Sequence, residues 1–149
     1  MNPFDLRAAL LAKHAQHVVL IHFPIALFIA GVIFDFLAQC AKRRALAAVA
    51  YYNLLGAAIS AGPAVITGLL AWQFQLGGQK LKGILLMHLI LGCTSACIIW
   101  LAWSLHLRAR LRSAGRIPVF RLGLEMLAVA VIALTGHLGG FLSGVNGPN

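Results

Sequence analysis

Four long apolar stretches constrain the fold of this chain more than any other feature of its sequence. They run over residues 18–40, 46–72, 84–105 and 118–142. A helix needs roughly 20 apolar residues to cross the hydrocarbon core of a bilayer, and each stretch is long enough to do so. The segments between them are too short to form a soluble catalytic domain. The sequence therefore predicts a single four-span membrane domain over residues 1–149.

The composition excludes the other broad classes of protein. Hydrophobic residues make up 61% of the chain and charged residues only 10%. So few charges can neither cover the surface of a soluble domain nor keep a disordered chain solvated. The net charge is +9, but the basic residues stand in short runs between the apolar stretches. That layout is typical of a membrane protein, so the expected partner is the lipid bilayer and not a nucleic acid.

We therefore expect an all-α integral membrane protein built as an antiparallel four-helix bundle. Residues 3–16 are expected to form a short N-terminal interfacial helix or a plain lead-in to the first span. Asn2 suits a helix cap, Pro3 the first helical position and Asp5 the first turn. The sequence leaves open whether the bundle acts alone or as a homo-oligomer.

The distribution of basic residues predicts the orientation of the bundle. Four basic residues belong to one side: Arg7, Lys13, Lys80 and Lys82. Eight belong to the other: Lys42, Arg43, Arg44, Arg108, Arg110, Arg112, Arg116 and Arg121. Because the more basic side stays in the cytoplasm, both termini are expected to face outward. The first span is too long for a secretion signal and lacks a small-residue cleavage site, so we expect it to be retained.

Three histidines lie at matching depths in the spans, and a fourth lies at the outer boundary. His22, His88 and His137 are five or six residues inside the outer ends of their spans, which is about 6–9 Å along a helix. His17 lies at the boundary itself. An imidazole in hydrocarbon needs a hydrogen-bond partner or a metal, so each should face the bundle interior. We expect the four side chains to converge in the outer-leaflet half of the bundle.

Neighbouring residues support an interior site. On the third span His88 is followed by Gly92 and Ser95 at helical spacing, which makes one small or polar stripe. Such a stripe lets helices pack closely or leaves room for a flat cofactor. His17 and His22 are five residues apart and would not share a face of a straight helix. Pro24 is expected to kink the first span and turn both imidazoles inward.

The remaining polar residues are expected to serve structure. His14 and His106 lie outside the spans and are interpreted as solvated. Glu125 is expected to pair with Arg121 four positions earlier. Asp35, near the cytoplasmic boundary, is expected to neutralise one of three arginines: Arg43, Arg44 or Arg121. The cysteines are interpreted as packing residues: Cys40, Cys93 and Cys97.

Several of these motifs together resemble one family. They are the segment His17-Val-Val-Leu-Ile-His22-Phe-Pro-Ile-Ala-Leu27, the run from Gly62 to Gly68, His88, and Thr135-Gly-His-Leu-Gly-Gly140. Over essentially the whole chain the sequence resembles domain-of-unknown-function family 2231, a family of predicted bacterial membrane proteins. Val18 departs from the family pattern, in which Pro often follows the first histidine. The resemblance implies a multi-pass protein of the bacterial inner membrane with four helices and no settled activity. Members joined to c-type cytochrome domains suggest redox work.

The leading functional hypothesis is a b-type cytochrome-like electron-transfer protein. Two imidazoles would hold haem b in the bundle core, with His22 and His88 as the preferred axial pair. His17 and His137 would form a second pair, for a second haem, or support the first. The expected partners are a quinone and a periplasmic cytochrome or other redox protein, which leaves a quinone-linked oxidoreductase activity open. Because all four histidines lie in the outer half of the membrane, electron transfer across the membrane is not expected.

Two alternatives remain open at the level of sequence. In the first, the imidazoles, with His22 and His88 as ligands, hold copper, iron or zinc without haem. In the second, the chain is a cofactor-free membrane scaffold or assembly subunit whose histidines bond one another or backbone carbonyls. The sequence offers no nucleophile or acid–base pair in a usual catalytic pattern, so it does not designate an enzyme.

Overall fold

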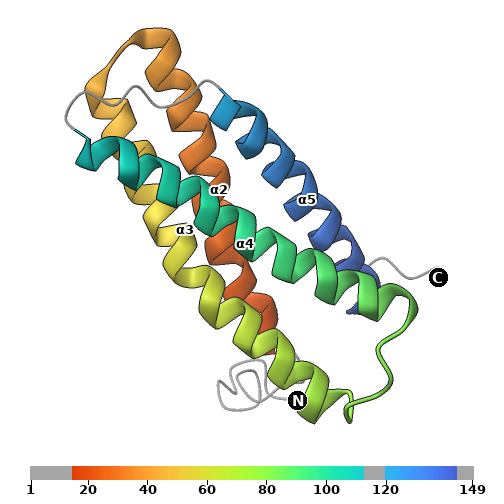
Figure 1. Cartoon of the computed structure of the whole chain (residues 1–149). Helices are drawn as coiled ribbons and strands as arrows, with labels where there is room; N and C mark the ends of the chain where they lie inside the picture. The colour runs from red at the N-terminus through yellow and green to blue at the C-terminus, as the bar shows by residue number, and fades with distance from the viewer. Residues whose placement is uncertain (1–14, 113–119, 144–149) are drawn as a thin grey trace, which may run out of the picture.

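The computed structural model describes residues 15–112 and 120–143, and within these ranges all its secondary structure is helical (Figure 1). The long helices are α2 (Ala15–Ala41), α3 (Arg44–Leu70), α4 (Gly83–Leu111) and α5 (Phe120–Leu142), and a short π-helix, η1 (Ala71–Gln75), continues α3. All four long helices are apolar and long enough to cross a membrane. The described chain is therefore a helical membrane bundle, as the sequence predicts.

The helices follow the expected spans closely, with one consequential difference. Helix α4 ends at Leu111, six residues beyond the expected end at 105, so His106 lies inside a helix and not in a loop. The expected interfacial helix falls mainly on residues 1–14, which lie outside the described residues, as do residues 118 and 119 of the fourth expected span.

The bundle consists of two packed pairs of helices. A tight turn at Lys42 and Arg43 connects α2 to α3, and these two helices pack against each other along their length. The second pair is formed by α4 and α5. The two pairs meet mainly through α3 and α4, while α2 and α5 make fewer contacts (Figure 1). The end of the bundle at which α2 and α4 begin is called the histidine end. The opposite end, at which α3 and α5 begin, is called the loop end.

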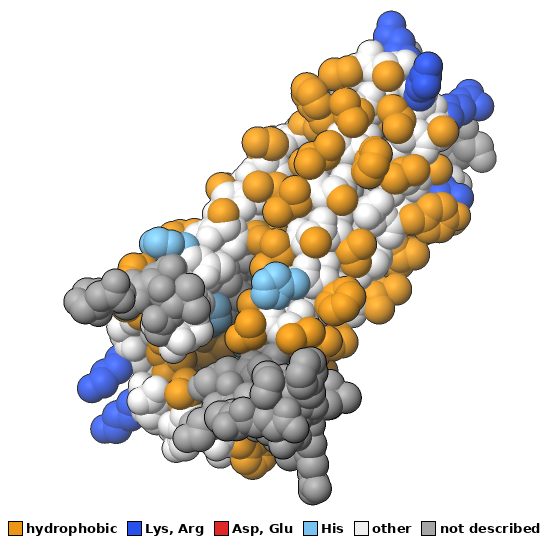
Figure 2. Space-filling model, turned by 180° about the vertical axis from the view of Figure 1, so that it is seen from behind, with side chains coloured by type: hydrophobic (Ala, Val, Ile, Leu, Met, Phe, Trp, Pro, Cys, Tyr) orange, Lys and Arg blue, Asp and Glu red, His pale blue; other side chains and the backbone are white. Residues whose placement is uncertain are grey.

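A dense apolar cluster closes the middle of the bundle. Its large members are Phe28, Leu54, Ile99 and Ile132, and alanines fill the narrow space between the helices. Most other large apolar side chains are exposed and cover the middle of the surface, while Lys and Arg gather at the two ends (Figure 2). Such a belt suits lipid contact, because hydrocarbon solvates these side chains as well as a protein core does. The two ends of the bundle are thus separated by packed hydrocarbon.

Gly31 sets the close approach of α2 to α3. A Cβ at this position would lie 2.9 Å from Leu54 Cδ2 and 3.3 Å from the Leu54 backbone nitrogen. Because backbone atoms cannot move aside cheaply, Gly31→Ala is expected to destabilise the bundle by about 1–3 kcal/mol. Gly123→Ala is the matched control, since nothing lies within 4 Å of its Cβ position. Thermal unfolding in detergent, followed by circular dichroism, checks this; equal stability of the two variants would contradict it.

Candidate cofactor site

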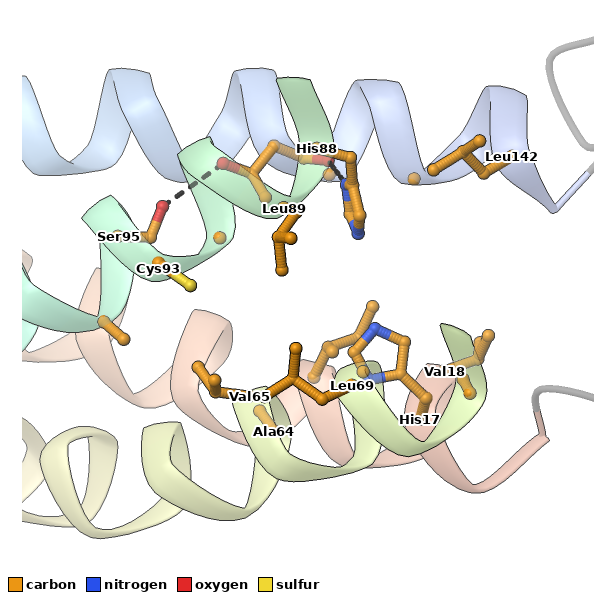
Figure 3. A pocket seen from close by; sticks show the side chains of 18 of the residues that line it. His17, Val18, Ala64, Val65, Leu69, His88, Leu89, Cys93, Ser95 and Leu142 are labelled. Atoms are coloured by element: carbon orange, nitrogen blue, oxygen red, sulfur yellow. Dashed lines mark hydrogen bonds between the residues drawn. The ribbon is translucent and has the colours of Figure 1, made fainter. Parts of the chain in front are cut away.

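A cavity of about 400 Å³ lies between the two helix pairs at the histidine end. All four long helices contribute to its wall, and the side chains around it are mostly apolar (Figure 3). Its volume is in the range of small-molecule and cofactor sites. Three of the four histidines predicted to form a site line this cavity: His17, His22 and His88.

His88 projects from α4 into the cavity with its ring fixed in one orientation (Figure 3). Its Nδ1 lies 3.0 Å from the backbone carbonyl oxygen of Thr135 on α5. A carbonyl only accepts hydrogen bonds, so Nδ1 carries the hydrogen and donates it. The lone pair of the ring is then on Nε2, which is the arrangement of a histidine prepared to bind a metal.

His17 lies on the opposite wall of the cavity, on α2, and its ring is held in the same way (Figure 3). Its Nδ1 lies 3.2 Å from the hydroxyl oxygen of Thr67 on α3. That hydroxyl donates its single hydrogen to the carbonyl oxygens of Pro63 and Ala64, at 2.9 and 3.1 Å. With the hydroxyl hydrogen directed at these carbonyls, Thr67 accepts from His17, which places the lone pair of this imidazole on Nε2 as well.

A glycine stands beside each of these two rings. A Cβ on Gly68 would lie 3.0 Å from Cε1 of His17, and a Cβ on Gly139 would lie 3.1 Å from Cε1 of His88. Both distances are shorter than ordinary van der Waals contact, so a larger residue at either position would push the ring away. The two walls of the cavity thus share one construction: a glycine, an imidazole and a hydrogen-bond acceptor for Nδ1.

The other two predicted histidines are placed differently. His22 borders the cavity but is exposed, and its Nδ1 donates to the carbonyl oxygen of Val18 on its own helix at 2.6 Å. His137 is exposed, packs edge-to-face on Phe141 with 5.0 Å between ring centroids, and is absent from the cavity wall. Helix α2 continues without a break past Pro24. His17 forms a hydrogen bond to the neighbouring helix α3, whereas His22 bonds within α2.

The predicted small and polar stripe on α4 does face the cavity. His88, Gly92 and Ser95 all line it, and the Ser95 hydroxyl lies 3.2 Å from the Thr135 hydroxyl at the deep end. On α3, small residues such as Ala64 and Gly68 also line the cavity. The stripe of small and polar residues on α4 therefore located the cavity on that helix.

Two sequence-based interpretations at the loop end are wrong. His106 is buried and not solvated, with its Nε2 2.8 Å from Oε1 of Glu125. Glu125 therefore pairs with His106 on α4 instead of with Arg121 on its own helix. Arg121 donates to both oxygens of Asp35, at 2.9 and 3.1 Å, and so is the partner of Asp35 among the three arginines considered. His106 was missed because α4 continues beyond it, although it follows His88 by eighteen residues, five helical turns.

Over the described residues the protein is a membrane bundle of four long helices with an internal cavity lined in part by imidazoles. A family model described as "Predicted membrane protein (DUF2231)" matches residues 13–147, so the chain belongs to this family. Comparison with curated proteins and with solved structures gave no match.

Proposed function

We propose that this protein is a membrane-embedded, b-type cytochrome-like electron-transfer protein that holds haem b in the cavity at the histidine end. One observation carries the proposal. His17 and His88 face the cavity from opposite walls, and each has its Nδ1 bonded to a neighbouring helix so that its lone pair is on Nε2. Our preferred axial pair is therefore His17 with His88, in place of His22 with His88.

The residues of the cavity fit a haem. Two imidazoles are a suitable donor set for its iron, and the wall offers the apolar side chains that a porphyrin contacts. The glycines beside the rings keep space where a side chain would displace an imidazole. When bound, haem supplies one-electron chemistry. The chain itself would orient the two rings through Thr67 and Thr135 and exclude water from the site through residues such as Ile25 and Leu69.

The position of the cavity limits the direction of electron exchange. The apolar cluster around Phe28 and Leu54 closes the bundle beyond it, and the histidines that line it are all at one end. Donor and acceptor would then approach from the same side, which we propose is the periplasmic side of a bacterial inner membrane. A quinone in the outer leaflet and a periplasmic redox protein suit these positions.

The test is the absorption spectrum of the protein purified in detergent from haem-replete cells, oxidised and then reduced with dithionite. We expect a sharp reduced α band of the b type with about one haem per chain, because both ligands are imidazoles. Metal analysis on the same sample separates the alternatives. A colourless protein with stoichiometric copper, iron or zinc would contradict the haem proposal in favour of a bare metal site. A colourless, metal-free protein would favour a scaffold.

A further inference from the structure

A second polar cluster is buried at the loop end, and the proposed electron transfer makes no use of it. It consists of Asp35 on α2, His106 on α4, and Arg121 and Glu125 on α5, all of them at most 7% exposed. Asp35 follows His17, and His106 follows His88, by eighteen residues, so the cluster lies about 27 Å from the cofactor cavity along the helices. The packed apolar cluster separates the two sites.

Asp35 and Arg121 form one half of this cluster and neutralise each other. The guanidinium donates from Nε to Oδ2 and from Nη2 to Oδ1 of Asp35. The amide of Gln39 also donates to Oδ2, at 3.2 Å. Both carboxylate oxygens of Asp35 are thus satisfied, as a buried bidentate ion pair requires.

His106 and Glu125 form the other half, and here the charges do not balance. Glu125 is completely buried, and its Oε2 has no hydrogen-bond partner among the described residues. The other described cations at the loop end are exposed, and the guanidinium of Arg110 lies over the ring of Tyr51. Helix α3 brings no ionisable group except its exposed first residue, Arg44, and the tyrosines. An ionised Glu125 beside a neutral His106 would leave one negative charge unpaired.

We propose that the His106–Glu125 pair is a binding site for a single proton. An unpaired carboxylate is very costly in a bilayer interior, and one proton removes the charge. Because the buried Oε2 has no partner among the described residues, we place this proton on Oε1 of Glu125, which then donates to Nε2 of His106 across 2.8 Å. Oε2 is then a carbonyl oxygen, for which burial without a partner costs less than for a carboxylate oxygen.

A proton fits this cluster better than a metal ion does. Ligand atoms of Asp35, His106 and Glu125 all lie within 4.8 Å of one another, a spacing that a metal site also shows. However, Arg121 already engages both oxygens of Asp35, and its positive charge would repel a divalent cation a few ångströms away. A proton completes the charge balance of the cluster without disturbing that ion pair.

The arrangement couples the proton to the contact between the two helix pairs. Asp35 belongs to the α2–α3 pair, while Arg121 and Glu125 lie four residues apart on α5, within reach of each other. While the two helix pairs are in contact, Asp35 forms an ion pair with Arg121, and Glu125 keeps its proton. If the pairs separate at the loop end, Arg121 can neutralise Glu125, and the proton leaves Oε1 for the water at that end.

Infrared spectroscopy of the full-length protein in lipid nanodiscs tests this proposal. The chain has only three acidic residues, so the C=O stretch of a protonated carboxylic acid is readily assigned. We expect this band in the wild type, shifted in D₂O, and lost in Glu125→Gln. Asp35→Asn should also lose it, although Glu125 is still present, because Arg121 is released to ionise Glu125. Both variants keep the cluster charge-balanced and are expected to fold. Arg108→Gln, which removes an exposed cation at the same end, should leave the band unchanged.

Three results would overturn the proposal. The first is a wild-type spectrum without a carboxylic acid band, which would mean that Glu125 is ionised. The second is a band that survives in Glu125→Gln or in Asp35→Asn, since the proton would then reside elsewhere or be independent of Asp35. The third is a stoichiometric divalent metal in the wild type that is lost in Glu125→Gln. None of these readouts depends on whether the cavity at the other end holds haem.

Discussion

Replacing either His17 or His88 with alanine is expected to abolish stable haem binding, while His137→Ala keeps it. Each of the first two variants removes one of the imidazoles that face the cavity from opposite walls. His137 lies outside the cavity wall and packs on Phe141, so its loss should not affect the ligands. The measurement is the haem-to-protein ratio of each purified variant, with its reduced spectrum.

Removing a hydrogen bond that orients one of the rings is expected to weaken haem binding without abolishing it. Thr67→Val preserves shape but removes the acceptor for Nδ1 of His17, and loss of such a bond typically weakens metal binding about 10–100-fold. The His88 ring should be unaffected, because its acceptor is a backbone carbonyl. Haem titration of the apoprotein measures this difference.

His22→Ala separates the two possible ligand pairs. If His17 and His88 are the ligands, this variant keeps a six-coordinate low-spin spectrum, because His22 is exposed and bonded to its own helix. If instead His22→Ala loses haem and His17→Ala retains it, the pair preferred from the sequence is correct and the proposed pair is wrong.

The fold could be predicted from the sequence because lipid imposes a simple requirement. A segment in hydrocarbon must satisfy its own backbone, so an apolar stretch of sufficient length becomes a spanning helix whatever its neighbours are. The stripe of His88, Gly92 and Ser95 could be predicted for the same reason, since small and polar side chains avoid lipid. These features depend on local composition and helical period alone.

The partners of individual side chains depend on how helices rotate against one another, which the sequence does not state. Depth alone could not distinguish His17 from His22, because only the packing of α2 on α3 brings Thr67 to His17. His106 was misplaced because the apolar pattern weakens at the end of α4, where Arg108 and Arg110 resemble a loop. Its spacing of eighteen residues from His88 was the available signal, since it places both on one face of α4.

Replacing Arg121 with methionine is expected to produce the largest loss of stability of any single change at the loop end. Arg121 is 7% exposed and Asp35 only 2%, so the substitution leaves a buried carboxylate without its cation. Removing one partner of a buried ion pair typically costs about 3–5 kcal/mol. Arg108→Met is the matched control, because Arg108 is exposed on the neighbouring helix. Unfolding of the purified variants by heat or by sodium dodecyl sulfate measures the difference.

The double variant Asp35→Asn with Arg121→Met separates two causes of lost stability. One is the loss of the favourable energy of the ion pair, and the other is the isolated charge that remains on Asp35 in Arg121→Met. Asparagine has nearly the shape of aspartate without its charge, so the double variant leaves no uncompensated ion from this pair. We expect it to recover most of the stability lost in Arg121→Met, since that loss arises from an isolated charge and not from a large favourable pairing energy. If instead the two losses add, Asp35 and Arg121 contribute independently, and the charge accounting of the whole cluster would have to be revised.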